Sequence, residues 1–249
     1  MGLLGLLVNS GGNISTIQIM SFIISAVVVV FLVMPVHEFA HGYAANKLGD
    51  PTARYQGRLT LNPMAHIDYL GALMIFLIGF GWAKPVSVNA RNFKNQKRDM
   101  ALTALAGPLS NIFFAFISFL LTNLCKFIIY KQGLTTEFNL FSFGSMPDSF
   151  WLVVFFVVFI VLQYIVLINI SLAVFNLIPI PPLDGSKVLA AFLPDRIYWK
   201  LMQYERYFSF VLIALIIVIS RTGLFSSVIN NVASVIDKAT WWPFELMLK

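Results

Sequence analysis

The feature that most constrains this chain is a long uncharged apolar stretch near its N-terminus. No charged side chain precedes Glu38, and residues 17–36 form an uninterrupted, mostly apolar run. A helix of about 20 apolar residues is long enough to cross a lipid bilayer. Ionisable groups are costly at membrane depth and mark functional sites there. The sequence therefore predicts a membrane-spanning helix with a functional site at its end.

The motif at the end of this run is His37-Glu38-Phe39-Ala40-His41. Residues four apart lie on one face of a helix, so His37 and His41 can direct imidazole nitrogens at one metal ion. Glu38 lies on an adjoining face, where it can accept a proton from a water molecule bound to that metal. A purely structural role would need buried partners for three polar groups, and the helix itself supplies none.

The composition is that of a polytopic membrane protein. Of the 249 residues, 59% are hydrophobic and 11% are charged, which argues against a soluble domain. The net charge of +6 does not require a nucleic-acid partner, because the basic residues gather in loops. The single cysteine excludes an intramolecular disulfide and a cysteine-based zinc site.

We predict an all-α polytopic membrane protein with a core of three transmembrane helices and at least one more. We expect residues 1–249 to form a single membrane-embedded domain. Its core covers about residues 17–190, and a C-terminal helical extension covers about residues 198–249. The expected spans are residues 17–45, residues 100–125, one crossing between residues 148 and 184, and a fourth from residue 207 to at least residue 220.

The region between the first and second spans is predicted to carry a small accessory structure. Residues 69–82 form an apolar run that is short for a crossing and contains three glycines, so we expect a re-entrant or partly spanning segment. The flanking segments, residues 52–62 and 83–92, show a modest alternation of apolar and polar residues and contain β-branched residues. We expect them to form short strands of a small β-sheet beside the site.

Basic residues set the expected orientation in the membrane. They cluster after the first span, before the second and after the third, whereas the loop between the second and third spans holds few. Cytoplasmic loops carry the excess of lysine and arginine. We therefore expect a multi-pass protein of the cell membrane whose active site lies toward the cytoplasmic side.

A catalytic zinc takes three protein ligands and keeps one position for water, so a third ligand is needed. The best candidate is Asp184, which ends an uncharged run and follows a break set by three prolines near Leu177. Gly185 permits a turn directly after it. The alternatives are that Asp184 caps the helix that begins at Ser186, and that His66 is the third ligand instead.

Several motifs resemble those of the site-2 proteases, which are intramembrane zinc metalloproteases. Residues 37–41 (HEFAH) are similar to the zinc-binding and catalytic motif of that family, and residues 176–185 are similar to its asparagine–proline and aspartate–glycine motif. Residues 107–111 (GPLSN) resemble the glycine-x-x-x-asparagine motif of the intervening core helix. Residues 57–68 and 81–86 resemble the compact bacterial and archaeal branch, which lacks a PDZ or nucleotide-binding insert. Tyr69 stands at a position where that branch commonly has proline.

The resemblance covers the chain from the first span to about residue 190, and it implies a mechanism. Zinc, held by His37, His41 and Asp184, would activate a water that attacks a peptide carbonyl, with Glu38 as the group that moves the proton. A developing oxyanion needs a donor, and the candidates are Asn111 and Asn176, which could instead join helices by hydrogen bonds. His66 is a candidate for orienting a nearby group or the substrate.

The implied partner is a membrane-protein substrate within the lipid bilayer. A helix engages its own carbonyls in hydrogen bonds, so the transmembrane segment must unwind before attack. We also consider a metal transporter that uses the same ligands, and an inactive scaffold of the same fold. A transporter has no need of Glu38 beside the metal, and the intact ligand set argues against a scaffold.

Overall fold

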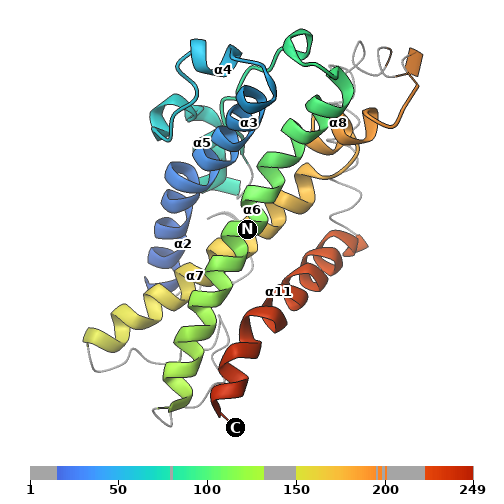
Figure 1. The fold of residues 1–249 in the computed structure, drawn as a ribbon. Helices are drawn as coiled ribbons and strands as arrows, with labels where there is room; N and C mark the ends of the chain where they lie inside the picture. Colours follow the sequence, from blue (N-terminus) through green and yellow to red (C-terminus); the bar gives the residue numbers. More distant parts are fainter. Residues whose placement is uncertain are drawn as a thin grey trace.

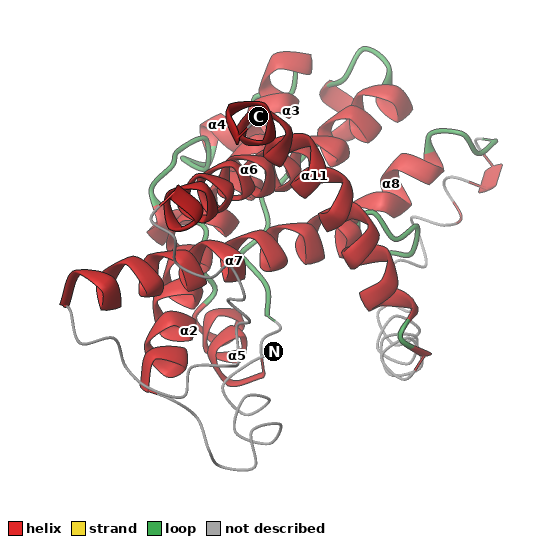
Figure 2. Cartoon of the chain, turned by 90° about the horizontal axis from the view of Figure 1, so that it is seen from below, coloured by secondary structure: helices red, strands yellow, loops and turns green. Residues whose placement is uncertain are grey.

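The computed structural model describes residues 16–78, 81–131, 150–194, 196–197, 200 and 222–248. Within these residues the regular secondary structure is helical (Figure 2). Three helical runs are long and apolar enough to cross a membrane: Ile19–Leu48, Gln96–Lys131 and Val157–Asn176. This confirms the predicted three-helix core of a multi-pass protein. The predicted fourth span, from residue 207 to residue 220, lies outside the described residues.

The first span is one helical run made of α2 (Thr16–Val28), a π-helical turn (Val29–Val33) and α3 (Met34–Leu48). The backbone stays in the right-handed helical region across both joints. Pro35 lies in the first turn of α3, a position that tolerates proline because its missing N–H is least needed there. The run ends at Gly49, which has a φ of 110° and caps the helix in the left-handed conformation.

The central element is α6 (Gln96–Lys131). Its start is capped reciprocally, because Asn95 Oδ1 accepts the Arg98 N–H and Asp99 Oδ2 accepts the Asn95 N–H. The helix packs against α3 and against three later helices, which are α7 (Phe150–Asn176), α8 (Asp184–Ala190) and α11 (Leu224–Leu248). Figure 1 shows α6 running the length of the molecule between them. One helix therefore joins the two ends of the fold.

The prediction of a small β-sheet between the first two spans is wrong. The two predicted strand segments instead contain α4 (Thr52–Tyr55) and the 3₁₀ turn η3 (Ala90–Asn92), and a second 3₁₀ turn, η2 (Pro63–Ala65), directly follows the first segment. Among the described residues, strand pairing is limited to an isolated bridge between Ile67 and Ala83. Local side-chain caps compete with strand pairing here, since Asn62 and Asn89 accept the backbone N–H groups that open the two turns.

The apolar run within this region forms a short helix, α5 (Tyr69–Ile78), of 10 residues. That length is too short for a crossing at about 1.5 Å per residue. The third span ends at Asn176, next to the predicted break at Leu177, and the chain then turns until α8 begins at Asp184. The proline-rich turn thus returns the chain toward the first span and α6.

Candidate metal centre

Three side chains from two distant parts of the chain meet at one point. His37 and His41 lie one helical turn apart on α3, and Asp184 is the first residue of α8. The two Nε2 atoms are 3.1 Å apart, and Asp184 Oδ2 is 3.5 Å from His37 Nε2 and 3.2 Å from His41 Nε2. Each of the three residues is 8–9% exposed. The helical spacing of the histidines is therefore completed by a carboxylate 143 positions after His41.

These separations fit a zinc ion. Zinc bonds to imidazole nitrogen and carboxylate oxygen of about 2.0–2.1 Å at tetrahedral angles place the ligand atoms about 3.3 Å apart. The donor set, two imidazoles and one carboxylate, is also the kind that zinc enzymes use. Among the described residues, His37, His41 and Asp184 form the one cluster of this kind. Three ligands leave one position open, as a catalytic site requires.

The charge state of Asp184 suits a metal ligand. Burial by itself raises the pKa of this carboxyl, but hydrogen bonds from His37 and His41 and the nearby charges of His41 and Lys187 outweigh burial. The resulting pKa lies well below the usual range. Lys187 Nζ is 3.8 Å from Asp184 Oδ1, one helical turn away on α8. Asp184 is therefore ionised, which is the form that binds a cation.

The second nitrogen of each imidazole is also bound, which fixes how the ring presents Nε2. His41 Nδ1 is 2.8 Å from the Thr103 carbonyl oxygen, so Nδ1 carries a hydrogen, and Nε2 can give up its own hydrogen when it binds a cation. His37 Nδ1 is 3.1 Å from the Asn111 amide, whose Oδ1 is buried without a partner. With the amide turned by 180°, which keeps its shape, Oδ1 accepts the Nδ1–H. Helix α6 thus holds Nδ1 of both histidines, which leaves Nε2 of each ring facing the cluster.

Two glycines allow the close approaches that build the centre. A Cβ atom at Gly107 of α6 would collide with both imidazole rings, at 2.6 Å from His37 Cε1. A Cβ atom at Gly185 would collide with the Leu177 carbonyl group, which belongs to the turn that leads to Asp184. Gly185 is therefore needed for space, because its φ is not positive. Because Gly107 and Gly185 have no side chain, α6 and the turn can pack directly against the site.

Glu38 lies beside the cluster and is held from outside the helix. Its Oε2 accepts the Val86 N–H at 2.9 Å, from the chain segment that follows α5. Its Oε1 forms no hydrogen bond within the described part of the chain. One carboxylate oxygen is thus fixed by the backbone, and the other is available for proton transfer.

The other predicted site residues lie at different places. Asn111 binds His37, as described above. Asn176 ends α7, and its side chain forms no hydrogen bond within the described residues. His66 is fully buried, and its Nε2 lies 2.8 Å from the Thr60 carbonyl oxygen. It does not belong to the metal cluster, so the geometry favours Asp184 as the third ligand.

Asp50 supports the segment that holds Glu38, and sequence reasoning missed it. The side chain is fully buried, and it accepts the Asn89 N–H at 2.7 Å and the Asn92 Nδ2 at 2.6 Å. Burial raises the pKa of Asp50, but hydrogen bonds from Thr52, Asn92 and Asn89 outweigh it and lower the pKa. An acidic residue directly after the helix-capping Gly49 was the available signal.

Comparisons with known proteins agree on one family. A family model described as Peptidase family M50 matches residues 25–219. The chain is 37% identical over 201 residues to "Putative zinc metalloprotease YwhC" of Bacillus subtilis, covering 81% of this chain and 82% of that protein. It is 29% identical over 157 residues to "Putative zinc metalloprotease MJ0611" of Methanocaldococcus jannaschii, covering 61% and 62% of the two chains.

A third relative is more distant. "Putative zinc metalloprotease Rip2" of Mycolicibacterium smegmatis is 26% identical over 186 residues, which cover 73% of this chain and 62% of that protein. No solved structure matches the chain. The region matched by the family model, residues 25–219, includes all three residues of the metal cluster, Glu38, the second and third candidate spans, and the first span from residue 25 onward.

Proposed function

The chain belongs to peptidase family M50, the site-2 protease family, and from this premise we propose that His37, His41 and Asp184 hold the catalytic zinc. The protein is an intramembrane zinc metalloprotease that acts on membrane-protein substrates. A metal transporter and an inactive scaffold are not favoured. The observation that carries the ligand assignment is the separation of 3.1–3.5 Å among the three donor atoms.

Each residue has a defined task in this proposal. A zinc ion in such a ligand set supplies Lewis-acid chemistry, because it lowers the pKa of water to about 7 and polarises a carbonyl. Glu38 takes a proton from the attacking water and returns it to the leaving amine. The Val86 N–H holds one carboxylate oxygen of Glu38, so the other points in a fixed direction. One water is consumed for each peptide bond cut.

The two asparagines take different tasks. Asn111 contacts His37, so it keeps that imidazole in the metal-binding tautomer. Asn176 has no hydrogen bond within the described residues, so its amide N–H is free to stabilise the oxyanion that develops on the substrate carbonyl. His66 supports the loop between the first two spans through the Thr60 carbonyl.

The substrate is a transmembrane segment that unwinds near the metal centre. Carbonyl groups in a helix are engaged in hydrogen bonds, so the scissile one must first be released. We place the centre toward the cytoplasm because basic clusters flank this end of the first and second spans. We also propose that the whole chain forms one membrane-embedded domain, with the core at residues 17–190.

Zinc analysis tests the ligand assignment. We expect about one zinc per chain in the purified protein and a large loss in Asp184→Ala. His66→Gln is the matched control, because it removes the competing histidine and should retain the metal. Zinc retained in Asp184→Ala and lost in His66→Gln would reverse the assignment.

Cysteine labelling tests the orientation in a Cys125→Ser background. Probes at Lys94→Cys and Lys200→Cys should react only from the cytoplasmic side, and a probe at Asn139→Cys only from outside. The opposite labelling would place the metal centre on the other face of the membrane.

A further inference from the structure

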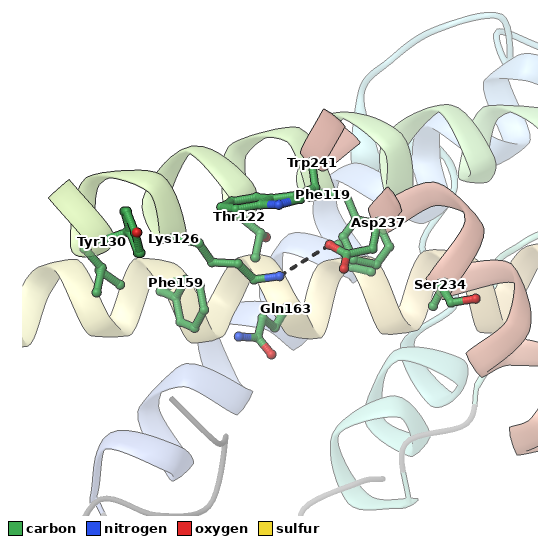
Figure 3. Close-up of a pocket in the computed structure, with 12 residues that line it drawn as sticks. Phe119, Thr122, Lys126, Tyr130, Phe159, Gln163, Ser234, Asp237 and Trp241 are labelled. Atoms are coloured by element: carbon green, nitrogen blue, oxygen red, sulfur yellow. Dashed lines mark hydrogen bonds and ion pairs between the residues drawn. The ribbon is translucent and has the colours of Figure 1, made fainter. Parts of the chain in front are cut away.

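A cavity lies between α6, α7 and α11, away from the metal cluster (Figure 3). Its volume of about 760 Å³ is within the range of small-ligand sites. Apolar side chains line part of it, including Phe119, Phe159 and Val166. Lys126 of α6 and Asp237 of α11 also line it, and their Nζ and Oδ1 atoms are 3.3 Å apart. The cavity therefore combines an apolar wall with one cation and one anion.

The position of the cavity along α6 corresponds to the headgroup level of a bilayer. Lys126 lies 19 residues after Gly107, which is about 28 Å along a helix that rises about 1.5 Å per residue. That distance is close to the roughly 30 Å thickness of the hydrocarbon core. Residues 100–125 carry no charge, so Lys126 is the first charged group after the apolar span. Tyr130 and Trp241 also line the cavity, and such aromatic residues gather at membrane interfaces.

The two charges are arranged so that both can engage a ligand. Their side chains are 37% and 38% exposed, and ion pairs at such exposure are weak. Asn123 Nδ2 and Lys126 Nζ both bind Asp237 Oδ1, and Oδ2 is free of hydrogen bonds within the described residues. Figure 3 shows Lys126 reaching toward Asp237, with the Gln163 amide of α7 on the same side of the cavity. The anionic group of a zwitterion can take the place of Asp237 beside Lys126, and its cationic group can take the place of Lys126 beside Asp237.

We propose that this cavity binds the headgroup of a phosphoethanolamine lipid in the leaflet opposite the metal centre. Lys126 contacts the phosphate, Asp237 contacts the primary ammonium, and the apolar wall contacts the upper acyl chains. The cavity carries one positive and one negative charge, so a neutral zwitterion suits it better than an anionic lipid, which would face Asp237. A primary ammonium donates hydrogen bonds to a carboxylate, whereas a quaternary choline group cannot.

Native mass spectrometry of the full-length zinc-loaded protein tests the proposal. The probes are phosphatidylethanolamine, phosphatidylcholine and phosphatidylglycerol with identical acyl chains, and glycerophosphoethanolamine without chains. We expect phosphatidylethanolamine to be retained about tenfold better than the other probes, the effect of one charge-assisted hydrogen bond. Equal retention of the three lipids would overturn the proposal. Equal binding of glycerophosphoethanolamine would mean that the site takes a soluble phosphoethanolamine and not a lipid.

Variants separate a ligand site from a merely structural ion pair. Asp237→Asn should abolish the preference for phosphatidylethanolamine over phosphatidylcholine, and Lys126→Gln should weaken the retention of both. Lys131→Gln is the matched control, because this exposed lysine lies over the Phe127 ring near the same helix end and does not line the cavity. Wild-type preference in Asp237→Asn would contradict the proposal.

A charge swap gives a second, independent test. The double variant Lys126→Asp and Asp237→Lys keeps an ion pair but places a carboxylate where the lipid phosphate should lie. We expect it to lose the preference for phosphatidylethanolamine while it retains zinc, which reports an intact fold. Unchanged lipid preference in this variant would assign the ion pair a structural role alone. Displacement of the lipid by a substrate peptide would instead mean that the cavity binds substrate.

Discussion

The two ends of α6 are built in opposite ways. Near the metal centre, Gly107 has no side chain and lies against two imidazoles that are each 8% exposed. Toward the other end, Lys126 extends a long flexible side chain into a cavity, and its ion pair is more than one-third exposed. Helices α3, α6 and α8 meet at the first end, whereas the C-terminal halves of α6 and α11 meet at the second (Figure 1).

This difference reflects what each end must hold. A metal centre needs donor atoms fixed to within a few tenths of an ångström, so its neighbours must be close and rigid. A half-exposed ion pair gives little stability and permits its partners to separate. We therefore expect changes near Gly107 to affect chemistry strongly, and changes near Lys126 to affect stability weakly.

The largest expected effect is at Glu38. Glu38→Gln removes the proton acceptor and leaves the three donor atoms in place, so cleavage should fall by at least about 10²–10⁴-fold. Zinc content should stay at the wild-type level. Peptide-cleavage assays and metal analysis on the same preparation check this outcome. A zinc-loaded Glu38→Gln protein with near-normal turnover would remove Glu38 from the mechanism.

The next largest effect is expected at Gly107. Gly107→Ala adds a Cβ atom that collides with both imidazoles, so one ring must move away from the cluster. We expect most of the zinc and most of the activity to be lost together. Leu109→Ala is the matched control, because this exposed residue is on the same helix. A Gly107→Ala protein with full zinc occupancy would show that the two ends of α6 are equally adaptable.

A smaller effect is expected at Asn111. Asn111→Ala removes the hydrogen-bond partner of His37 Nδ1, and partners of this kind are worth about 10–100-fold in metal affinity or activity. Asn111→Asp keeps an acceptor and should bind zinc more tightly than Asn111→Ala. Competition with a chelator measures both affinities. Identical affinities in the wild type and both variants would contradict the assigned hydrogen bond.

Asp50 should show a pH-dependent effect on stability. Its pKa is lowered in the folded protein, so its contribution is fully present above the unfolded value of about 3.9 and is lost as the pH falls through the folded value. The difference in Tm between wild type and Asp50→Asn should be constant at neutral pH and should shrink below about pH 4. A difference that instead grows on acidification would contradict the ionised state of Asp50.

The smallest effect is expected for the ion pair at the other end. Lys126→Gln should lower stability by about 1 kcal/mol or less, because the pair is half-exposed and screened. Cleavage of a soluble peptide should be unchanged, since the cavity is far from the metal centre. Thermal unfolding and cleavage assays measure both. A large loss of activity in Lys126→Gln would contradict the inference that only the metal-centre end of α6 affects the chemistry strongly.

The spans and the histidine pair were predictable because they depend on local rules. Uncharged length predicts a crossing, and a spacing of four residues places His37 and His41 on one helical face wherever that helix lies. Asp184 was selected for similar reasons, since prolines end the preceding helix and this aspartate ends the uncharged run. The structure then brought it to 3.2 Å from His41.

The prediction of a small β-sheet failed because hydrogen bonds to short polar side chains, which cap local turns, outweigh a weak alternation of apolar and polar residues. Asn62 and Asn89 close 3₁₀ turns locally, and a weak alternating pattern carries no information about such caps. The fourth predicted span lies outside the described residues and stays a prediction. Asp50 was missed because the two partners that tie it to the segment after α5, Asn89 and Asn92, are 39 and 42 positions away in the chain.

The sequence by itself determined the membrane class, the three apolar spans, the helical face that His37 and His41 share and the family. Those properties depend on residue type and on spacing within one segment. Only the tertiary structure decided which groups hold the second nitrogen of each histidine, why residue 107 must be glycine, and where Lys126 meets Asp237. Each of these depends on contacts between helices far apart in the chain, and the spacing within one helix cannot specify them.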